Sequence, residues 1–391
     1  MNTVCEATIG TLPIDYGAVL NCAIYENSGF VPYGKISFID TLHYFDDDFD
    51  FQTYSKFTIT ISNLDESNNK TKRISFTGDI IACSLKRDKS NQSTMVVDLT
   101  FINRGDNSKL FTSIAPMAIP SSNSITAIQQ ICKTAGITCN VSGINTNDSM
   151  NWLIVNHNLL TALNFITDHS YIDDDALTYS IKLDGTVIIR SMKTTFAQDP
   201  LIQFTPYQIL DIPNDSIDVI YYYDSQSANN SGILQESFSV ASKSAISDPG
   251  QNKIVTKNQG VAPGSDGGDR GTNNTNKTRY APQKSPQTHE NYGIAPDYRK
   301  SVLATYSRTM NFSCVNESYT SIGDLINVND GIYHSNSFVQ SNINSGKYII
   351  TKKAYHFNID GHSKTLTTFI QAVKDKTIYN NPTADKIRNG K

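Results

Sequence analysis

The chain has 391 residues, more than the roughly 100–200 residues of one ordinary domain, so its length argues against one compact core. Charged residues make up only 18% of it and the net charge is −4, which gives no electrostatic basis for clamping nucleic acid. The 20 Tyr and 17 Phe residues, with many Asn, Ser, Thr and Ile residues, favour strands and loops over helices.

Targeting signals and cysteines point to a protein made in a cytoplasm. No apolar run approaches the roughly 18–20 residues that span a bilayer, so no membrane span is expected. Residues 1–6 contain neither a basic segment nor an apolar stretch, so no signal peptide is expected either. The six cysteines form no CxxC pair, which is typical of reduced thiols. They are Cys5, Cys22, Cys83, Cys132, Cys139 and Cys314.

Residues 1 to about 115 carry a strand pattern. From 57 to 62, apolar residues alternate with Thr and Ser, the period of a strand with one buried face. The segments 74–81 and 95–102 flank a polar turn at 87–93, which indicates a hairpin. The sequence therefore predicts antiparallel, hairpin-linked β-structure here.

The period changes at about residue 121. Apolar residues follow helical spacing after Ser122–Ser124, which offers N-capping side chains, and Gly136 is a natural C-terminal stop. A second helix is predicted from Asn158 to about Tyr171. Asp184-Gly185 between two apolar segments then predicts a hairpin with a two-residue turn. The segment 121–195 is therefore predicted to be a small α/β module inserted between β-rich regions.

Strand patterning returns at 201–223, and then the composition changes. From Lys257 to Pro296, Gly, Asn, Pro and Ser dominate and few residues are aliphatic. Such a segment buries too little apolar surface to offset its ordering entropy, which predicts a long polar loop that a partner orders. β-patterning resumes from Ser301, and the chain ends in a short basic tail.

The sequence contains a weak internal repeat. Laying Gly78–Ile102 over Gly346–Ile370 at an offset of 268 residues gives five identities in 25 positions. The identities alone do not separate a repeat from two unrelated hairpins. Each copy, however, has a Gly-led strand, a polar turn and a closing strand, which favours two related β-domains.

Candidate metal ligands are few. His157 and His169 are twelve residues apart and share no helical face, so we interpret them as surface or helix-end residues. The acidic runs 46–50 and 173–175 lack the alternating spacing and terminal Glu of a calcium loop, which favours solvated turns.

Catalytic motifs are absent from the sequence. It contains no GxSxG, GxxxxGK[ST] or HExxH. Cys139 and Cys314 have no His nearby in the sequence, although a spatial Cys–His pair stays open. We therefore expect no enzyme and no cofactor, and the sequence supports no catalytic, cofactor-binding or metal-binding residue.

The helical module carries a resemblance to a known family. Residues 124–136 are followed by Asn151-Trp152, by a helix that begins near Asn158, and by Leu177-x-Tyr179 before Asp184-Gly185. This series resembles the middle domain of phage tail hub proteins. These are the baseplate hub or late-control proteins of long-tailed phages, related to the base of the type VI secretion spike.

The C-terminal part carries the same resemblance. Ile322-Gly-Asp324 and a later segment, Ser345-Gly346-Lys-Tyr348 to His356, are similar to the second barrel of the family. The likeness covers about 120–200 and 300–375, and it extends over 1–115 by strand pattern only.

The resemblance implies a mainly β fold with an α+β insertion, in which each chain contributes two tail-tube-like β-barrel domains and a small α/β domain to a ring-forming trimer. Domain boundaries follow from combining it with the patterns above. They are a first tube-like β-barrel domain at 1–118, completed by about 200–224; the inserted α/β domain at 119–199; the long polar loop at 225–300; a second tube-like β-barrel domain at 301–380; and a flexible basic tail at 381–391.

The resemblance also implies a function, that of a structural virion protein at the tail tip or baseplate. Three chains with two tube-like domains each mimic a six-fold ring, which joins the hexameric tail tube to a trimeric central spike and lines the channel for DNA ejection. The implied partners are the other copies of a homotrimer, the tail tube protein, the central spike protein, baseplate wedge or other tail-tip proteins and the tape measure protein. Genomic DNA passes without specific binding.

Two other interpretations stay open. A distal tail or receptor-binding β-protein would share the composition, and a tail-associated peptidoglycan hydrolase would place a Cys or Glu site inside 121–195. For the hub, we expect the alternating polar residues of 57–62 to face a solvent-filled lumen. These residues are Thr58, Thr60 and Ser62.

Overall fold

The computed structural model describes residues 2–40 except 16, then 56–64, 70–87, 95–104 and 109–205 except 142, 156 and 174. Further along it describes strands at 216–225, 238–240, 255–257 and 279–281, and then stretches of 289–374 separated by short gaps. The described residues form 23 strands and three helices, and all three helices lie between residues 124 and 196. The predicted mainly β fold with few helices is confirmed.

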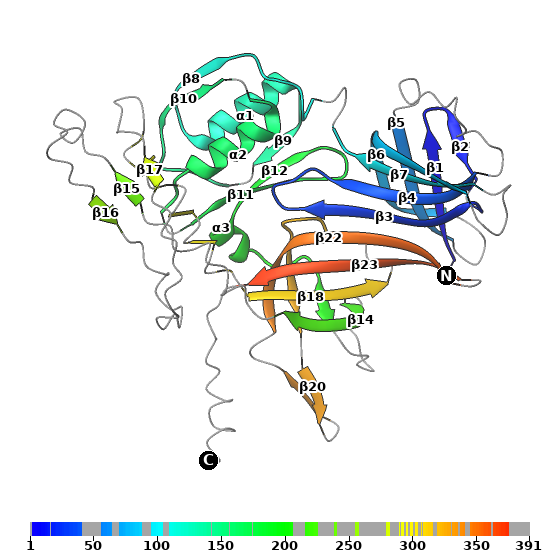
Figure 1. The fold of residues 1–391 in the computed structure, drawn as a ribbon. Helices are drawn as coiled ribbons and strands as arrows, with labels where there is room; N and C mark the ends of the chain where they lie inside the picture. The colour runs from blue at the N-terminus through cyan, green and yellow to red at the C-terminus, as the bar shows by residue number, and fades with distance from the viewer. Residues whose placement is uncertain are drawn as a thin grey trace.

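The first sheet region is an antiparallel sheet in the order β3-β4-β7-β6-β5-β1-β2 (Figure 1). Alternating burial along β7, from Met95 to Ile102, shows the period-2 pattern of a strand with one buried face. Its strands are β1 (Asn2–Ile9), β2 (Leu12–Ile14), β3 (Val19–Asn27), β4 (Tyr33–Asp40), β5 (Lys56–Leu64), β6 (Lys70–Arg87) and β7 (Met95–Ile102).

One polar position of this region differs from the expectation. Thr58 and Thr60 are partly exposed, but Ser62 is only 3% exposed. A register shift in the pairing of β5 with β6 between Ile61 and Ser62 turns the strand at this point. The prediction that Ser62 faces solvent beside Thr58 and Thr60 is therefore wrong for the single chain.

The second sheet region has strand pairings that return to their starting strand. They run β19-β13-β14-β18-β23-β22, and β22 also pairs with β19. The strands are β13 (Gln203–Thr205), β14 (Ser216–Ser225), β18 (Arg308–Val315), β19 (Leu325–Val328), β22 (Gly346–Asp360) and β23 (Ser363–Lys374).

Residues 200–224 differ from the expectation as well. The sequence assigned them to the first domain, but β14 pairs with β18 and β13 pairs with β19, so both strands belong to the second sheet region. A strand's hydrophobic pattern specifies which face is buried, and it does not specify which edge finds a partner.

The long hairpin of β22 and β23 serves both sheet regions. β22 pairs with β3, which makes one continuous 13-stranded sheet. Tyr355, Phe357 and Leu366 of the hairpin are buried in the core of the first sheet region. Ile350 and Ile370 of the same hairpin are buried in the core of the second. The two cores therefore share one element.

The predicted repeat corresponds to two real hairpins with different turns. Both pairs, β6–β7 and β22–β23, are antiparallel, and each has a register shift in its first strand. Residues 88–94 separate the strands of the first hairpin, but only 361–362 separate those of the second. The offset of 268 residues therefore aligns β7 with β23 and part of β6 with β22, but it does not align the residues that pair across the two hairpins: Ile102 pairs with Asp79, and Ile370 pairs with Lys353.

The α/β module lies beside the two sheet regions in Figure 1 and has its own core around Trp152. Both predicted helices are confirmed, with Asn123 and Asn158 as N-caps and Gly136 as the C-cap. The module consists of β8 (Met117–Ser122), α1 (Ser124–Ala135), β9 (Cys139–Val141), β10 (Met150–Ile154), α2 (Leu159–His169), β11 (Leu177–Ile181), β12 (Val187–Ser191) and α3 (Met192–Phe196).

The predicted hairpin at Asp184-Gly185 is confirmed, but its turn is wider than two residues. The N–H of Gly185 donates to the carbonyl of Lys182 at 2.9 Å, and the N–H of Lys182 donates to Thr186 at 3.0 Å. Gly185 has a φ of +84°, which suits glycine as the last residue of a three-residue loop.

Three predicted segments lie wholly or mostly outside the described residues. Within 225–300, three short strands pair with one another in the order β16-β15-β17. Most of the predicted loop, the acidic run 46–50 and the tail 381–391 lie outside the described residues. The strands are β15 (Phe238–Val240), β16 (Val255–Lys257) and β17 (Arg279–Ala281), and a separate hairpin joins β20 (Gly331–His334) and β21 (Ser337–Gln340).

Candidate functional site

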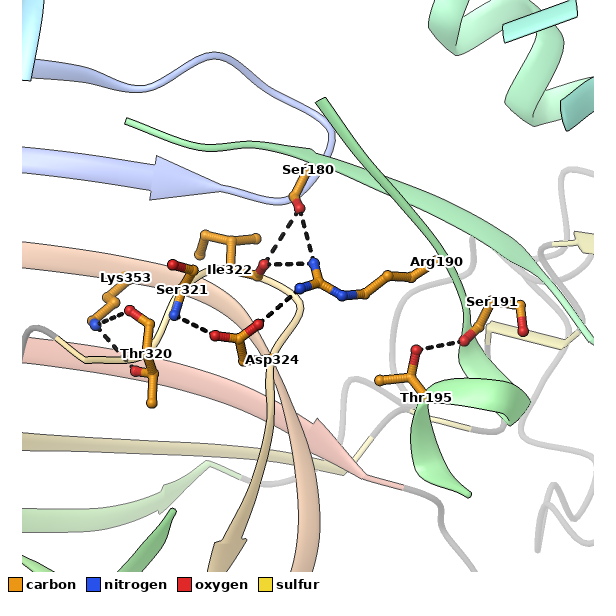
Figure 2. A network of polar contacts seen from close by, with 9 residues as sticks. All are labelled: Ser180, Arg190, Ser191, Thr195, Thr320, Ser321, Ile322, Asp324 and Lys353. Atoms are coloured by element: carbon orange, nitrogen blue, oxygen red, sulfur yellow. Dashed lines mark hydrogen bonds and ion pairs between the residues drawn. The ribbon is translucent and has the colours of Figure 1, made fainter. Parts of the chain in front are cut away.

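A polar junction joins the α/β module to the second sheet region (Figure 2). Arg190 at the end of β12 donates from Nη1 to the carbonyl of Ile322 at 2.9 Å. Its Nη2 pairs with Oδ1 of Asp324 at 2.7 Å, and Nη1 also lies 3.3 Å from the hydroxyl of Ser180. One guanidinium therefore satisfies acceptors on the module and on the Ile322–Asp324 turn.

The turn that receives Arg190 is built around Gly323. Gly323 has a φ of +83°, and a Cβ there would lie 2.3 Å from Nη1 of Arg190. Its N–H donates to Ile350 of β22 at 2.8 Å, and Asp324 Oδ2 accepts from the N–H of Ser321 at 2.7 Å. Only glycine fits both the backbone conformation and the close approach of the guanidinium.

Burial and the carboxylate of Asp324 shift the pKa of Arg190 in opposite directions. Burial lowers the pKa of Arg190 from its ordinary value, and the charge of Asp324 opposes this effect. The two side chains are only 22% and 19% exposed. Because desolvation offsets much of the attraction in such pairs, the contact specifies geometry more than it adds stability.

A second buried network lies next to this turn and joins the two sheet regions. Lys353 of β22 is 1% exposed, and its Nζ donates to the carbonyl of Thr320 at 2.6 Å and to its hydroxyl at 3.0 Å. The Nζ also lies 4.8 Å from the ring centroid of Tyr355. The hydroxyl of Tyr355 donates to Glu26 of β3 at 3.1 Å. The network therefore crosses the β3–β22 pairing.

The module also contacts the first sheet region. The N–H of Gly29, after β3, donates to the carbonyl of Tyr179 at 3.0 Å, and the hydroxyl of Tyr179 lies 2.9 Å from the carbonyl of Gly29. Asn103 donates from Nδ2 to Leu183 at 2.7 Å, and Val31 is buried in the core of the module. The β11–β12 hairpin therefore contacts both sheet regions.

A cavity of about 360 Å³ lies where these parts meet. Tyr179, Arg190, Arg299 and Tyr306 contribute to its lining. Arg299 donates from Nε to Leu177 at 3.1 Å and from Nη1 to Asp168 at 3.3 Å, so it is held by the module. The charged side chains around the cavity, Arg190 and Arg299, are thus bonded to neighbouring parts of the chain. Such bonds hold adjoining parts of the chain together.

The structure brings His157 and His169 to one aromatic cluster, which sequence spacing did not indicate. Their rings lie 5.4 and 4.7 Å from the ring of Phe165, and His169 stacks on Tyr292 at 4.6 Å. The Nδ1 of His169 lies 2.8 Å from the carbonyl of Phe165. The prediction of a helix-end position is confirmed for His169, which lies in the last turn of α2.

The cysteine and aspartate candidates have structural contacts. Cys139 lies within hydrogen-bonding range of Cys132, and the thiol of Cys314 lies 3.8 Å from the carbonyl of Thr368. Asp175 accepts from the N–H of Lys193 at 2.9 Å. All six cysteines are free thiols, as predicted. Among the residues that the structure describes, no three His, Cys, Asp or Glu side chains are grouped to hold a metal ion, and no helix is long and apolar enough to cross a membrane.

Sequence reasoning missed the residues that join the parts. Arg190 and Lys353 each occupy a strand, and their partners are 132 and 33 residues away in the sequence. The nearest available signal was Gly323 in the Ile322–Asp324 motif, because glycine between two strand-like segments often marks a turn.

Comparison with known proteins rests on structure alone, because no family model matches the chain and no curated protein matches it by sequence. The tail protein of Neisseria meningitidis MC58 superposes with a TM-score of 0.56 and 9% identity, over 97% of this chain and 98% of that one. The 43 kDa tail protein of prophage MuSo2 from Shewanella oneidensis gives 0.56 and 9%, over 95% and 98%.

A third neighbour is the E. coli protein c3393, described as a component of the type VI secretion system. It superposes with a TM-score of 0.48 and 8% identity, over 93% of this chain and 75% of that one. Its TM-score is below 0.5, so the first two neighbours alone define the fold. This chain therefore has the fold of phage tail proteins, which confirms the predicted resemblance at the level of the fold.

Proposed function

We propose that this chain is a non-enzymatic structural protein of a phage tail, and that three copies form the hub that joins a hexameric tail tube to a trimeric central spike. The observation that carries the proposal is the fold, which matches two tail proteins over nearly the whole of each chain. Each chain has two sheet regions, and we take each region as one tube-like unit. Three copies would then supply the six units of a ring.

The sheet edges support assembly into a ring. In the described part of the chain, β1 pairs with β5 over Asn2–Ile9 but with β2 only over Ala7–Ile9. The remaining edge of β1 has no second ladder partner in the described part of the chain and lies beside β23 of the same chain. Pairing between copies satisfies such edges and closes the ring.

In this ring the partners are the tail tube protein above, the central spike protein below, the tape measure protein, and wedge or other tail-tip proteins that bind the polar segment within 225–300. Thr58 and Thr60, both partly exposed, line a polar channel. The net charge of −4 lets DNA pass without tight binding. The site of action is the tail tip of the virion.

Electron microscopy and mass photometry of the purified full chain test this function. We expect a threefold ring with an open centre and a mass of three copies of the 43.2 kDa chain. A chain that stays monomeric, with and without its phage's tail tube protein, would contradict the hub. Clearing of cell-wall substrate in a zymogram would instead favour a peptidoglycan hydrolase.

A further inference from the structure

The α/β module contacts both sheet regions through one hairpin. Along β11, Tyr179 and Ser180 are neighbours, and they contact different regions. The carbonyl of Tyr179 accepts from Gly29 in the first sheet region, and the hydroxyl of Ser180 donates to Ile322 beside the second. On the adjacent strand β12, Arg190 holds the same Ile322–Asp324 turn.

We infer that the module is a brace that fixes the angle between the two sheet regions, with Arg190 on the Ile322–Asp324 turn as its locking contact. The two regions join through the pairing of β3 with β22, through the β22–β23 hairpin that carries residues of both cores, and through the Lys353 network. A shared hairpin keeps some freedom to twist and bend, because the twist angle between adjacent strands varies by tens of degrees. A third body that contacts both regions removes this freedom.

The contacts are suited to setting an angle. The module has its own core, so it acts as one rigid body between the regions. Its contact with the second region has an apolar cluster around Met192 and Leu325, and it borders the cavity of about 360 Å³. To this packing Arg190 adds directional bonds to Ile322 and Asp324, which specify the orientation more strictly than apolar packing alone.

The reason why the angle must be fixed rests on the proposed function. Six tube-like units in a closed ring must be related by rotations of about 60°. Two of these units belong to one chain, so their angle has to be fixed within the chain before the copies meet. A brace between them supplies that angle.

Spin-label distances between the sheet regions test the brace without reference to assembly. The labels are attached to cysteines introduced at Thr77 of β6 and at Asn329 after β19, and their distance reports the angle between the two sheet regions. The two partly exposed cysteines, Cys83 and Cys139, are replaced by Ser so that they are not labelled. Arg190→Ala removes the locking contact from the module, and Gly323→Ala disturbs it from the turn, because the added Cβ would meet the guanidinium. Both variants should broaden the narrow distance distribution of the parent protein.

Arg299→Ala is the matched control, because Arg299 lines the same cavity but is bonded to Leu177 and Asp168 of the module. It should keep the parent distribution. Arg190→Lys keeps the charge without the paired geometry and should broaden it partly. Unchanged distributions in Arg190→Lys and Gly323→Ala, with intact far-ultraviolet circular dichroism, would overturn the brace.

Mass photometry of the same variants separates the brace from the hub. If the parent forms three-copy rings and Arg190→Ala forms open or mixed oligomers, both inferences are supported. If the variants keep both their rings and their distances, the brace fails and the hub stands. If the parent forms no ring but the variants broaden the distances, the hub fails and the brace stands.

Discussion

Arg190 and Lys353 owe their roles to neighbours that are distant in sequence. Each places a cationic group on backbone carbonyls of the 320–322 segment, at 2.9 Å from Ile322 and 2.6 Å from Thr320. The segment is thereby tied both to the module and to β22. Neither residue stands out in the sequence, because a basic residue in a strand is usually solvated and no local pattern identifies its acceptor.

His169 makes the stability of the module depend on pH. Burial lowers the pKa of His169 from its ordinary value, and the carbonyl of Phe165 and the charge of Asp168 only partly oppose this. The folded state therefore disfavours the protonated imidazole. The contribution of His169 to stability is fully present above about pH 6.5, the pKa of this imidazole in the unfolded chain. It is lost as the pH falls from there towards the lower pKa of His169 in the folded state.

Chemical denaturation of the parent protein and of His169→Gln at about pH 7.5 and about pH 5.5 tests whether His169 lowers the stability on acidification. We expect the parent to lose more stability than the variant on acidification. Other groups also titrate, so the difference between the two proteins is the relevant quantity. An equal loss in both would show that His169 does not contribute to the pH dependence.

At the scale of elements, the helices of the module are determined by local chemistry. Asn123 Oδ1 accepts from the N–H of Thr126 at 2.8 Å, and Gly136 ends α1 with a φ of +67°. Asn158 caps α2 in the same way, by accepting from Thr161 at 2.8 Å. Such caps act within one turn of helix, so residue order alone indicated them.

Removing the cap of α1 tests its contribution. Asn123→Ala should lower the free energy of unfolding by about 1 kcal/mol, because an N–H at the helix start loses its acceptor. Gln129→Ala on the exposed face of the same helix is the control, with an expected change near zero. Denaturation followed by fluorescence of Trp152, the single tryptophan, measures both. Equal changes in the two variants would argue against the cap.

At the scale of the whole molecule, the chain has two sheet cores that share one hairpin and a module with a separate core. Phe357 and Ile350 lie on the same strand, β22, in different cores. Loss of either core therefore disturbs the other through that strand. The module can unfold more independently of the two sheet cores, because its buried residues lie on its own elements, apart from Val31 and the segment before β8.

Two optical probes separate these units. Phe357→Ala in the first sheet core should cost about 3–5 kcal/mol, and it should shift the denaturation midpoint from circular dichroism more than that from Trp152 fluorescence. Ile128→Ala in the module core, at about 2–5 kcal/mol, should shift the fluorescence midpoint more. Both side chains are fully buried. Coincident shifts of both probes in both variants would mean one cooperative unit.

The sequence alone indicated many of the elements and most of their buried faces, with Ser62 as an exception. Alternation marked β5 and β7, capping residues marked α1 and α2, and Asp184-Gly185 marked the hairpin of the module, because each signal acts between residues close in the chain. Which strand edges pair became known from the three-dimensional structure. It placed β13 and β14 in the second sheet region, and it placed Arg190 on the turn at Gly323. These contacts join residues more than 80 positions apart, and a local pattern does not encode the partner of an edge or of a buried charge.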